Sequence, residues 1–529
     1  MTLASRGRVA EFIDHLAVVG VRAEKIVPLA GVTAQLQLKA TDWSFAAQVA
    51  SQQKLRWSAI WGDHRSPDIV IRALFFGSDG HLLLQTTVAE KSPELASHAP
   101  FYLAANRPER YLHDMFGVTF TESHDSRRWG RHQAWAETDF PLLETFPVAG
   151  FPVDETPPDS GYPFEPVVGE GVYEIPVGPV HAGIIEPGHF RFQAVGENIL
   201  RLEERLGYVH KGIEKIAVGR DLAGLIRLAG RVSGDSTIAH SWAACQAVER
   251  ALHISPPPRA SAVRAILAER ERIANHLGDI GAICNDVGFA FAQYQMSRLR
   301  ELWQRQNQQL TGHRLLMDSL CPGGVTVDLD QSAIAAMREE ITQLRSEIEE
   351  LLPLLLEYPS LQDRLSDYAI LSPETAEKLG AVGYVGRASQ LADDLRRDAP
   401  YPPYQELKVK VPVFSTGDLT GRLRVRGEEI LISLDLLAKL VRSIPSGSLV
   451  TRYSLPDCDV EGIGLVEGWR GETLAYLRLD KQGRVLRYFP RDPSWLTWQA
   501  LEMMLDGVIV PDFPVCNKSV NGSYSGHDL

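Results

Sequence analysis

The stretch that decides the fold is "PVGPVHAGIIEPGHFRFQAVGENILRLEERLGYVHKGIEK", residues 176–215. Its first half, as far as Gly196, alternates short apolar runs with Pro and Gly, which predicts β-strands around tight turns. From about residue 195 to residue 358 the apolar residues recur at helical spacing. We therefore predict that strands in this stretch lead directly into a long helical region.

One helix of that region is especially clear. In "AIAAMREEITQLRSEIEELLPLLLEY", residues 333–358, apolar side chains recur at alternating steps of three and four residues. The stripe consists of Ile334, Met337, Ile341, Leu344, Ile348, Leu351 and Leu355. Heptad spacing of this kind is typical of a helix packed in a bundle, so we interpret the stripe as core and not as a cofactor site.

Mixed patterns flank the helical region. Residues 1–146 combine helical runs with strand-like stretches such as "PDIVIRALFFGSDGHLLLQTTV" at 67–88, in which "GSDG" is typical of a hairpin turn. The prolines of residues 147–171 cannot sustain a helix or a central strand. We predict an α+β protein with three parts: a small N-terminal α/β domain at 1–146, a Pro-rich linker at 147–171, and a mainly α-helical domain with peripheral strands at 172–529.

Composition excludes several classes of function. The 529 residues carry a formal net charge of −13, which argues against a nucleic-acid partner because phosphate binding needs a basic surface. No uncharged apolar run approaches the ~18 residues of a membrane span, and the N-terminus lacks the apolar core of a signal peptide. The five cysteines are scattered without a CxxC pair, which suits a reducing cytosol. We expect a cytoplasmic chain that reaches a membrane through other subunits.

The segment "RLAGRVSGDSTIAH", residues 227–240, has the spacing of a metal site. Ser233 and Ser236 lie three residues apart, just before His240, at the predicted start of a long helix, and this spacing puts both side chains on one side of a turn. Two cysteines at these positions would make a metal clamp. Serine hydroxyls, however, are hard neutral ligands, whereas nickel at low valence needs soft thiolates.

Several longer stretches identify a family. The opening stretch resembles the large subunit of the membrane-bound, complex I-related (group 4) [NiFe]-hydrogenases and the homologous D-type subunit of NADH–quinone oxidoreductase. The resemblance covers residues 172–529 and includes "RIANHLGDIGAICNDVGF", "CPGGV", "VGRAS", "RRDAPYPPY" and "GWRGE". The N-terminal "PERYLHDMFGVTF" and "HDSRR" resemble the C-type subunit of the same respiratory complex. The chain therefore resembles the natural fusions of C-type and D-type subunits found in enzymes of the formate hydrogenlyase type.

The resemblance implies a set of partners. It implies a peripheral-arm subunit of an oxidoreductase on the inner face of the cell membrane, docked to a small iron–sulfur subunit of the B type found in complex I. It also implies contact with membrane subunits that move ions. The iron–sulfur cluster belongs to the small subunit, because this chain has no cysteines spaced to bind one. A quinone is one acceptor that the resemblance suggests, and we expect no cofactor bound by this chain alone.

The same resemblance locates the family's four nickel ligands. The hydrogenases read R-V-C-G-x-C where this chain has Ser233 and Ser236, and D-P-C-x-x-C near the C-terminus. Aligned on Ser519, Tyr524 and Asp528, the second pair falls on Ser523 and Gly526. All four thiolate positions are therefore degenerate, and we predict that the chain binds no nickel.

Other residues are candidates for the same cavity by resemblance. His181 and His189 fall in the loop that lines the quinone headgroup site in complex I, and the competing interpretation makes them structural loop histidines. Lys211 matches an arginine that approaches the terminal iron–sulfur cluster, with a surface pair to Glu214 as the alternative. The cavity candidates are His181, His189, Asp235, His240, Arg387, Asp393 and Arg470, with an Arg–Asp network expected among the last three. We expect Asn521 and Asp528 to join Ser233, Asp235, Ser236, His240 and Ser523 in a small polar pocket. The competing interpretation is a replacement of cysteine by serine that only preserves packing.

Two hypotheses of different classes follow. In the first, the chain lines a redox cavity in which a quinone or another acceptor takes electrons from the partner's cluster. In the second, it is a non-catalytic scaffold that couples another subunit's chemistry to the membrane arm. A Tyr or His that lines a wide entry would favour the first, but Gly234 occupies the position of the headgroup-binding tyrosine of complex I. A cavity closed by side chains would favour the second.

Overall fold

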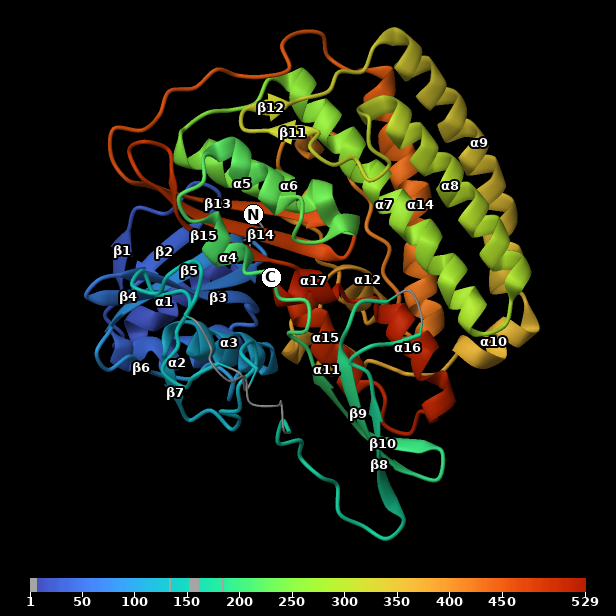
Figure 1. The fold of residues 1–529 in the computed structure, drawn as a ribbon. Coiled ribbons are helices and arrows are strands. Elements are labelled where there is room, and N and C mark those ends of the chain that lie inside the picture. Colours follow the sequence, from blue (N-terminus) through green and yellow to red (C-terminus); the bar gives the residue numbers. More distant parts are fainter. Residues whose placement is uncertain (1–6, 133–134, 152–160, 183–184) are drawn as a thin grey trace, which may run out of the picture.

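The computed structural model describes residues 7–132, 135–151, 161–182 and 185–529. The N-terminal domain is a sheet of strand order β1-β2-β5-β4-β3, seen at the lower left of Figure 1. Its strands are β1 (Glu24–Ile26), β2 (Ala34–Gln37), β3 (Arg56–Arg65), β4 (Asp68–Gly77) and β5 (Gly80–Ala89). Gly77 pairs with Gly80, which confirms the predicted hairpin turn between β4 and β5.

Three helices and a small second sheet complete this domain. They are α1 (Arg8–Val18), α2 (Trp43–Gln52), α3 (Asn106–Phe116), and the parallel pair β6 (Glu94–Ala96) and β7 (Thr119–Thr121). α3 ends at Gly117, whose φ of 78° is the left-handed conformation that glycine adopts readily at a helix C-terminus. The helix directs Glu109 and Asp114 into the protein interior, where both are buried.

The opening stretch folds as a three-stranded antiparallel sheet of order β10-β9-β8, which projects from the body at the bottom of Figure 1. Its strands are β8 (Val172–Val177), β9 (His189–Val195) and β10 (Asn198–Arg205). The predicted strands are confirmed as far as residue 195. The expectation of helix directly after 195 is wrong, because residues 198–205 pair with β9, and the first helix begins at Ile213. β10 buries Ile199 and Leu202 on either side of a register irregularity between Ile199 and Arg201, and residues 202–205 are all buried.

Long helices form the bundle on the right of Figure 1. They are α7 (Pro258–Asp286), α8 (Ala290–Thr311), α9 (Gln331–Leu356) and α14 (Leu419–Arg442). The predicted stripe of α9 faces the core with one correction: Leu352 is buried, whereas Leu351 is partly exposed. The α-helix turns once in 3.6 residues, so the buried face drifts away from a strict seven-residue repeat.

Shorter helices and a second sheet surround the bundle. The helices are α4 (Ile213–Ala217), α5 (Leu222–Ala229), α6 (Thr237–Ala251), α10 (Pro359–Leu365), α11 (Pro373–Lys378), α12 (Gly383–Ala388), α13 (Leu395–Asp398), α15 (Ser494–Met503), α16 (Phe513–Val520) and α17 (Tyr524–Asp528). The strands are the pair β11 (Leu320–Cys321) and β12 (Gly324–Val325), and the antiparallel sheet β13 (Val460–Gly468), β14 (Gly471–Leu479) and β15 (Val485–Arg491). The α+β architecture with a mainly helical second part is therefore confirmed. The described residues contain no helix that is long and apolar enough to cross a membrane.

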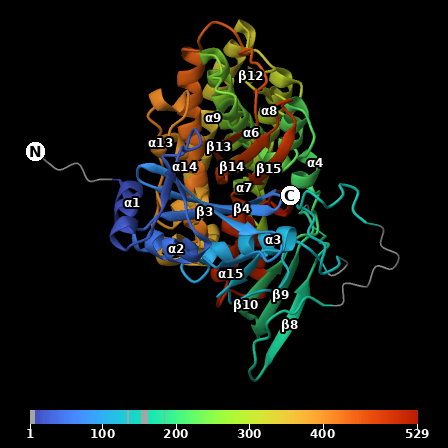
Figure 2. The ribbon, with the colours of Figure 1, turned by 90° about the vertical axis from the view of Figure 1, so that its left-hand side faces the viewer.

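The N-terminal sheet packs against the β13–β15 sheet through a largely polar interface, visible in Figure 2 where β3 and β4 lie beside β14 and β15. Arg56 donates to Glu472 at 2.7 Å, and Arg478 reaches Asp63 at 3.2 Å. Two aromatic contacts join the same sheets: the ring of Trp61 stacks on Phe489 with centroids 5.5 Å apart and lies tilted against Tyr476 at 5.3 Å. The contact between the two parts is therefore specific, since buried charges need their partners.

The predicted linker at 147–171 lies partly outside the described residues, which omit 152–160. Its described parts, 147–151 and 161–171, contain no helix or strand. The boundaries stay a prediction, and we expect residues 1–150 expressed alone to be soluble and folded, because water can solvate the polar interface once it is exposed. Circular dichroism tests this; an unfolded fragment beside a folded full chain would show that the boundary is wrong.

Candidate functional site

Two segments far apart in the sequence meet at the predicted metal positions. Ser233 immediately precedes a single 3₁₀ turn, Gly234–Ser236, which leads into α6. Ser523 is the N-cap of α17. The two hydroxyls lie in hydrogen-bond contact, with 2.8 Å between Ser233 Oγ and Ser523 Oγ. Ser523 Oγ also accepts the backbone N–H of Gly526 at 2.9 Å. The prediction that both ends of the hydrogenase-type site come together is therefore confirmed in the geometry of this chain.

Arg470 bridges the two segments. Its guanidinium binds Asp235 through two hydrogen bonds of 2.8 and 2.7 Å and donates to Ser236 Oγ at 3.1 Å. Its Nε donates to the carbonyl of Asn521 at 2.7 Å, so one side chain holds both halves of the site. Burial works to raise the pKa of the Asp235 carboxyl, but Arg470 beside it holds that pKa below its usual range. Arg470 thus pairs with Asp235, and not with Asp393 as the expected network among Arg387, Asp393 and Arg470 required.

The fourth ligand position has no room for a side chain. A Cβ at Gly526 would lie 2.6 Å from Cγ of Asp492 and 3.0 Å from Cβ of Ser523. Asp492 cannot yield easily, because His240 Nε2 lies 2.8 Å from its Oδ2 and the N–H of Ser494 donates to its Oδ1 at 2.8 Å. Burial alone would raise the pKa of Asp492, but His240, Arg470 and Ser494 together outweigh it and hold that pKa far below its usual range.

A nickel–iron centre does not fit these residues. Ser233, Ser236 and Ser523 are each at most 5% exposed and offer hard hydroxyl oxygens in place of thiolates. Two of them already touch each other, and the carboxylate of Asp492 fills the space beside Gly526. Among the residues that the structure describes, no group of three or more His, Cys, Asp or Glu side chains is arranged to hold a metal ion. Hydrogen bonds and one ion pair hold the segments together at this junction, which we call the serine junction: Ser233, Asp235, Ser236, Arg470, Ser523 and Gly526.

The two loop histidines bind backbone carbonyls. His181 Nε2 lies 2.7 Å from the carbonyl of Gly188, and His189 Nδ1 lies 3.3 Å from that of Gly178. The loop does cover the C-terminal helix, because Glu186 accepts the N–H of Ser525 at 2.9 Å. No interaction places either imidazole against the serine junction within the described part of the loop, which omits residues 183–184. The geometry therefore matches the structural interpretation of both histidines.

Arg387 belongs to a separate, deeper network. It is fully buried and contacts three carboxylates: Glu429, Glu467 at 2.5 Å and Asp394 at 3.0 Å. The expected pairing with the Asp393 side chain is wrong, because that carboxylate turns outward to Arg56 at 2.9 Å and gives Arg387 only its backbone carbonyl. The chain direction explains this difference, since adjacent side chains in an extended segment point to opposite sides.

Lys211 lies at the edge of the serine junction. Its Nζ donates to the carbonyls of Val232 and Ser525, both at 3.2 Å, so it lies beside both segments of the junction. The alternative pairing with Glu214 is wrong, because that carboxylate binds Arg487 at 2.5 Å. Burial lowers the pKa of Lys211, although its side chain keeps an exposed surface. The remaining candidate, Asp528, accepts the N–H groups of Gly207 and Val209 at 2.9 and 3.0 Å and so fastens α17 to the opening stretch.

Two important carboxylates were not predicted from the sequence. Asp492 lies at the end of β15, and Glu429 lies on the buried face of α14, where it binds His276 at 2.7 Å. Burial would raise the pKa of Glu429, but Arg387, His276 and Arg272 together hold it well below its usual range. A signal was present for Glu429, because it falls at helical spacing with the core residues Leu436 and Leu440, although Arg422, Arg426 and Ser433 are buried on the same helix.

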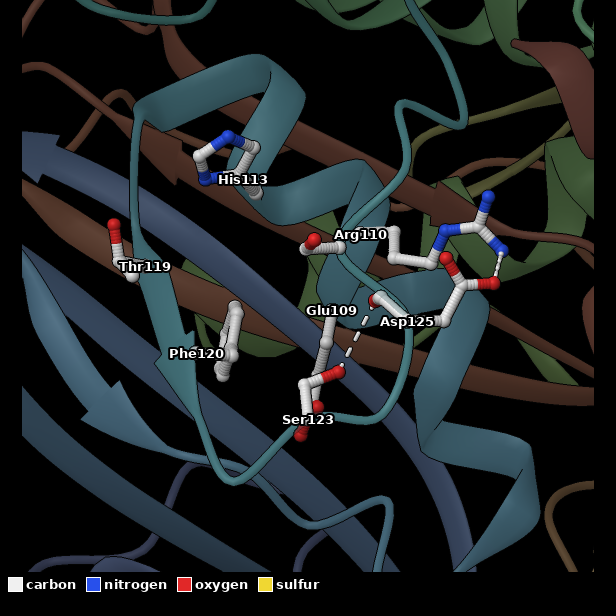
Figure 3. A pocket seen from close by; sticks show the side chains of 8 residues that line it. Glu109, Arg110, His113, Thr119, Phe120, Ser123 and Asp125 are labelled. Atoms are coloured by element: carbon white, nitrogen blue, oxygen red, sulfur yellow. Dashed lines mark hydrogen bonds and ion pairs between the residues drawn. The ribbon is translucent and has the colours of Figure 1, made fainter. Parts of the chain in front are cut away.

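A small pocket in the N-terminal domain lies apart from the serine junction (Figure 3). It has a volume of about 70 Å³ and is lined by residues of α3 and of the loop after β7, among them Glu109, His113 and Asp125. Burial raises the pKa of Glu109 to about 8, although Ser97 and the N–H of His98 donate to its carboxyl group. Its size suits a few water molecules and not an organic substrate.

Comparison with known proteins places this geometry in a family. Residues 22–152 match the 30 kDa subunit of respiratory-chain NADH dehydrogenase, and residues 286–457 match its 49 kDa subunit. Residues 211–278 match the nickel-dependent hydrogenases. Formate hydrogenlyase subunit 5 of Escherichia coli is 31% identical over 454 residues, which cover 85% of this chain and 80% of the relative. The chain belongs to the family of complex I-type and membrane-bound hydrogenase large subunits.

Other members of this family show the same fused organisation or the same fold. The fused C/D subunit of the NADH-quinone oxidoreductase of Phocaeicola vulgatus is 30% identical over 417 residues, covering 74% of this chain and 78% of the relative. Among solved structures, a chain of the membrane-bound sulfane sulfur reductase, an archaeal respiratory membrane complex, superimposes with a TM-score of 0.64. It is 25% identical, and the match covers 69% of this chain and 100% of that one. Members of this large-subunit family thus include subunits of hydrogenase, quinone-reducing and sulfur-reducing complexes.

Proposed function

We propose that this chain is the large peripheral-arm subunit of a complex I-like oxidoreductase on the inner face of the cell membrane, and that it works without a nickel–iron centre. In this proposal it docks a small iron–sulfur subunit and couples electron transfer there to ion movement in membrane subunits. The serine junction carries the proposal. Three hydroxyls, one carboxylate and the Arg470 guanidinium meet where the family resemblance predicts the metal positions of the hydrogenases, and these contacts support the proposal.

The packing of the junction favours coupling over direct reduction of an acceptor by this chain. A quinone carbonyl needs a donor that faces an open site. Here His181 and His189 bind backbone carbonyls, and the resemblance predicts Gly234 at the position of the complex I tyrosine. The binding of a quinone headgroup is therefore the second candidate, suggested by the loop that covers α17.

The first test measures metal and hydrogen. We expect the purified complex to contain no stoichiometric nickel and to show neither uptake nor evolution of hydrogen, because hydroxyl ligands do not stabilise low-valent nickel. Elemental analysis of the complex, with iron from the partner's cluster as an internal standard, checks this. Close to one nickel per chain would contradict the proposal.

The second test asks whether electrons pass beside this chain. Lys211→Met removes a cation at the edge of the serine junction and keeps an apolar stem of similar length. A nearby cation stabilises the reduced, more negative state of a cluster, so its removal should lower the midpoint potential of the partner's cluster. We expect a fall of tens of millivolts, since ~1.4 kcal/mol corresponds to roughly 60 mV for one electron.

The matched control for this redox test is Lys215→Met. Lys215 lies one turn further on, and its Nζ donates to the carbonyl of Leu143 in the direction of the N-terminal domain. Redox titration followed by electron paramagnetic resonance should show an unchanged midpoint for this variant. Equal midpoints for wild type and Lys211→Met would place the cluster elsewhere and leave a purely structural role for this surface.

A further inference from the structure

A large cleft lies between the N-terminal domain and the helical domain, away from the serine junction. It has a volume of about 530 Å³ and is formed by α3, the loop at 123–129, β10 and α15. These elements lie together at the lower part of Figure 2. Its size is within the range of sites that bind organic ligands or several side chains. The motif residues Arg110, His124, Asp125 and Arg127 contribute to its lining, but the proposed coupling role does not explain the cleft.

The floor of the cleft holds two carboxyl groups that share one guanidinium. Arg107 contacts Glu204 at 2.9 Å and Glu502 at 2.6 Å. Glu204 is completely buried, and its Oε1 has no hydrogen-bond partner among the described residues. The Glu502 side chain is 21% exposed, so it is the accessible member of the pair. Burial raises the pKa of both groups, which reflects incomplete neutralisation by Arg107.

The lining as a whole is rich in acidic groups and has an apolar rim. Six acidic side chains and four arginines line the cleft, so acidic groups outnumber guanidinium groups by two. Leu103, Leu200 and Met503 stand at its edge with 42%, 39% and 53% of their surfaces exposed. Exposed apolar side chains around a polar centre are typical of a surface that binds another protein.

We propose that this cleft is the docking site for a basic segment of another subunit of the complex. A lysine or arginine of that segment pairs with Glu502, and its apolar neighbours pack on Leu103, Leu200 and Met503. The proposal rests on the proposed function in one respect, namely that the chain works inside a multi-subunit complex. It does not depend on the state of the serine junction.

Alkylation of a cysteine at the cleft edge tests the proposal. Met503→Cys places a thiol on the exposed rim, and peptide mass spectrometry measures its alkylation separately from the native cysteines. We expect this thiol to react several-fold more slowly in the purified complex than in the isolated chain. A cross-linker that joins a thiol to an amine should connect it to a lysine of another subunit.

Charge reversal provides the specificity control. Adding Glu502→Lys should repel the basic segment and restore fast alkylation, whereas Glu137→Lys, outside the cleft on a side chain that is 96% exposed, should not. Equal alkylation rates in the complex and the isolated chain would overturn the proposal, and so would protection that survives Glu502→Lys. Protection of the isolated chain by vesicles of anionic lipid would assign the cleft to a membrane instead. Nickel content and the midpoint potential are unaffected by these outcomes, so the proposed function is tested separately.

Discussion

Replacing Arg387 by methionine should prevent stable folding of the helical domain. The guanidinium is fully buried and touches the carboxylates of Glu429, Glu467 and Asp394, so its loss leaves three buried negative charges facing one another. Removing one partner of a buried ion pair costs about 3–5 kcal/mol of stability. Because Arg387 has three such partners, we expect its loss to cost at least the upper end of that range. We expect little soluble protein, or a large fall in the thermal unfolding midpoint.

Arg298→Met is the matched control for Arg387→Met. Arg298 belongs to the same helical domain and also pairs with a glutamate, Glu347. Its side chain, however, is 44% exposed, whereas that of Arg387 is fully buried. An exposed ion pair contributes less than about 1 kcal/mol, so the melting midpoint should barely move. Differential scanning calorimetry of both variants makes the comparison. Similar small shifts for the two would mean that the deep network does not stabilise the fold.

A cysteine placed at Gly526, the predicted fourth ligand position, should destabilise this chain. A Cβ at residue 526 would lie 2.6 Å from Cγ of Asp492, whose carboxylate is held by His240 and by the N–H of Ser494. Overpacking of a well-filled site costs roughly 1–3 kcal/mol, so Gly526→Cys and Gly526→Ala should both lower the melting midpoint. An open cavity shaped for a metal would instead accept the added side chain without a fall in the melting midpoint.

Gly234→Ala serves as the control within the same junction. Its Cβ would meet only Cε of Met317, at 3.7 Å, which is an ordinary van der Waals contact. Thermal unfolding should therefore distinguish the two glycines, with a clear loss of stability at position 526 and little change at 234. If Gly526→Cys is as stable as wild type and gains stoichiometric nickel when combined with cysteines at 233, 236 and 523, the junction is an intact metal pocket.

Local patterns determined much of the architecture. The β4–β5 hairpin, the strands around Gly188 and the helix α9 all follow from periodicity and turn residues, because these depend on neighbours in the sequence. The same patterns were misleading where long-range pairing decided the outcome. Residues 198–205 form strand β10 because they pair antiparallel with β9. The buried face of α9 includes Leu352 in place of the predicted Leu351 because the helices packed against α9 determine which face is buried.

Residue identity at four positions was enough to predict a degenerate metal site. The absence of thiolate side chains at 233, 236, 523 and 526 is a property of the sequence. Because nickel at low valence needs soft thiolate ligands, this absence predicts that no nickel binds there. The sequence also determined that the two motifs are far apart, at residues 233–236 and 523–526. The resemblance predicted that the two motifs meet, and the hydroxyls of Ser233 and Ser523 lie 2.8 Å apart in the structure.

The tertiary structure alone decided what fills the site and which charges are paired. Asp492 occupies the space beside Gly526, although the two residues are 34 positions apart in the sequence. Arg387 forms its ion pair with Asp394 and not with Asp393. Sequence spacing cannot predict such choices, because a buried charge is stabilised by whichever opposite charges the fold brings within a few ångströms. The inter-domain cleft has the same origin, since Glu204, Glu502 and Arg107 come from three elements and are close only when both domains are packed.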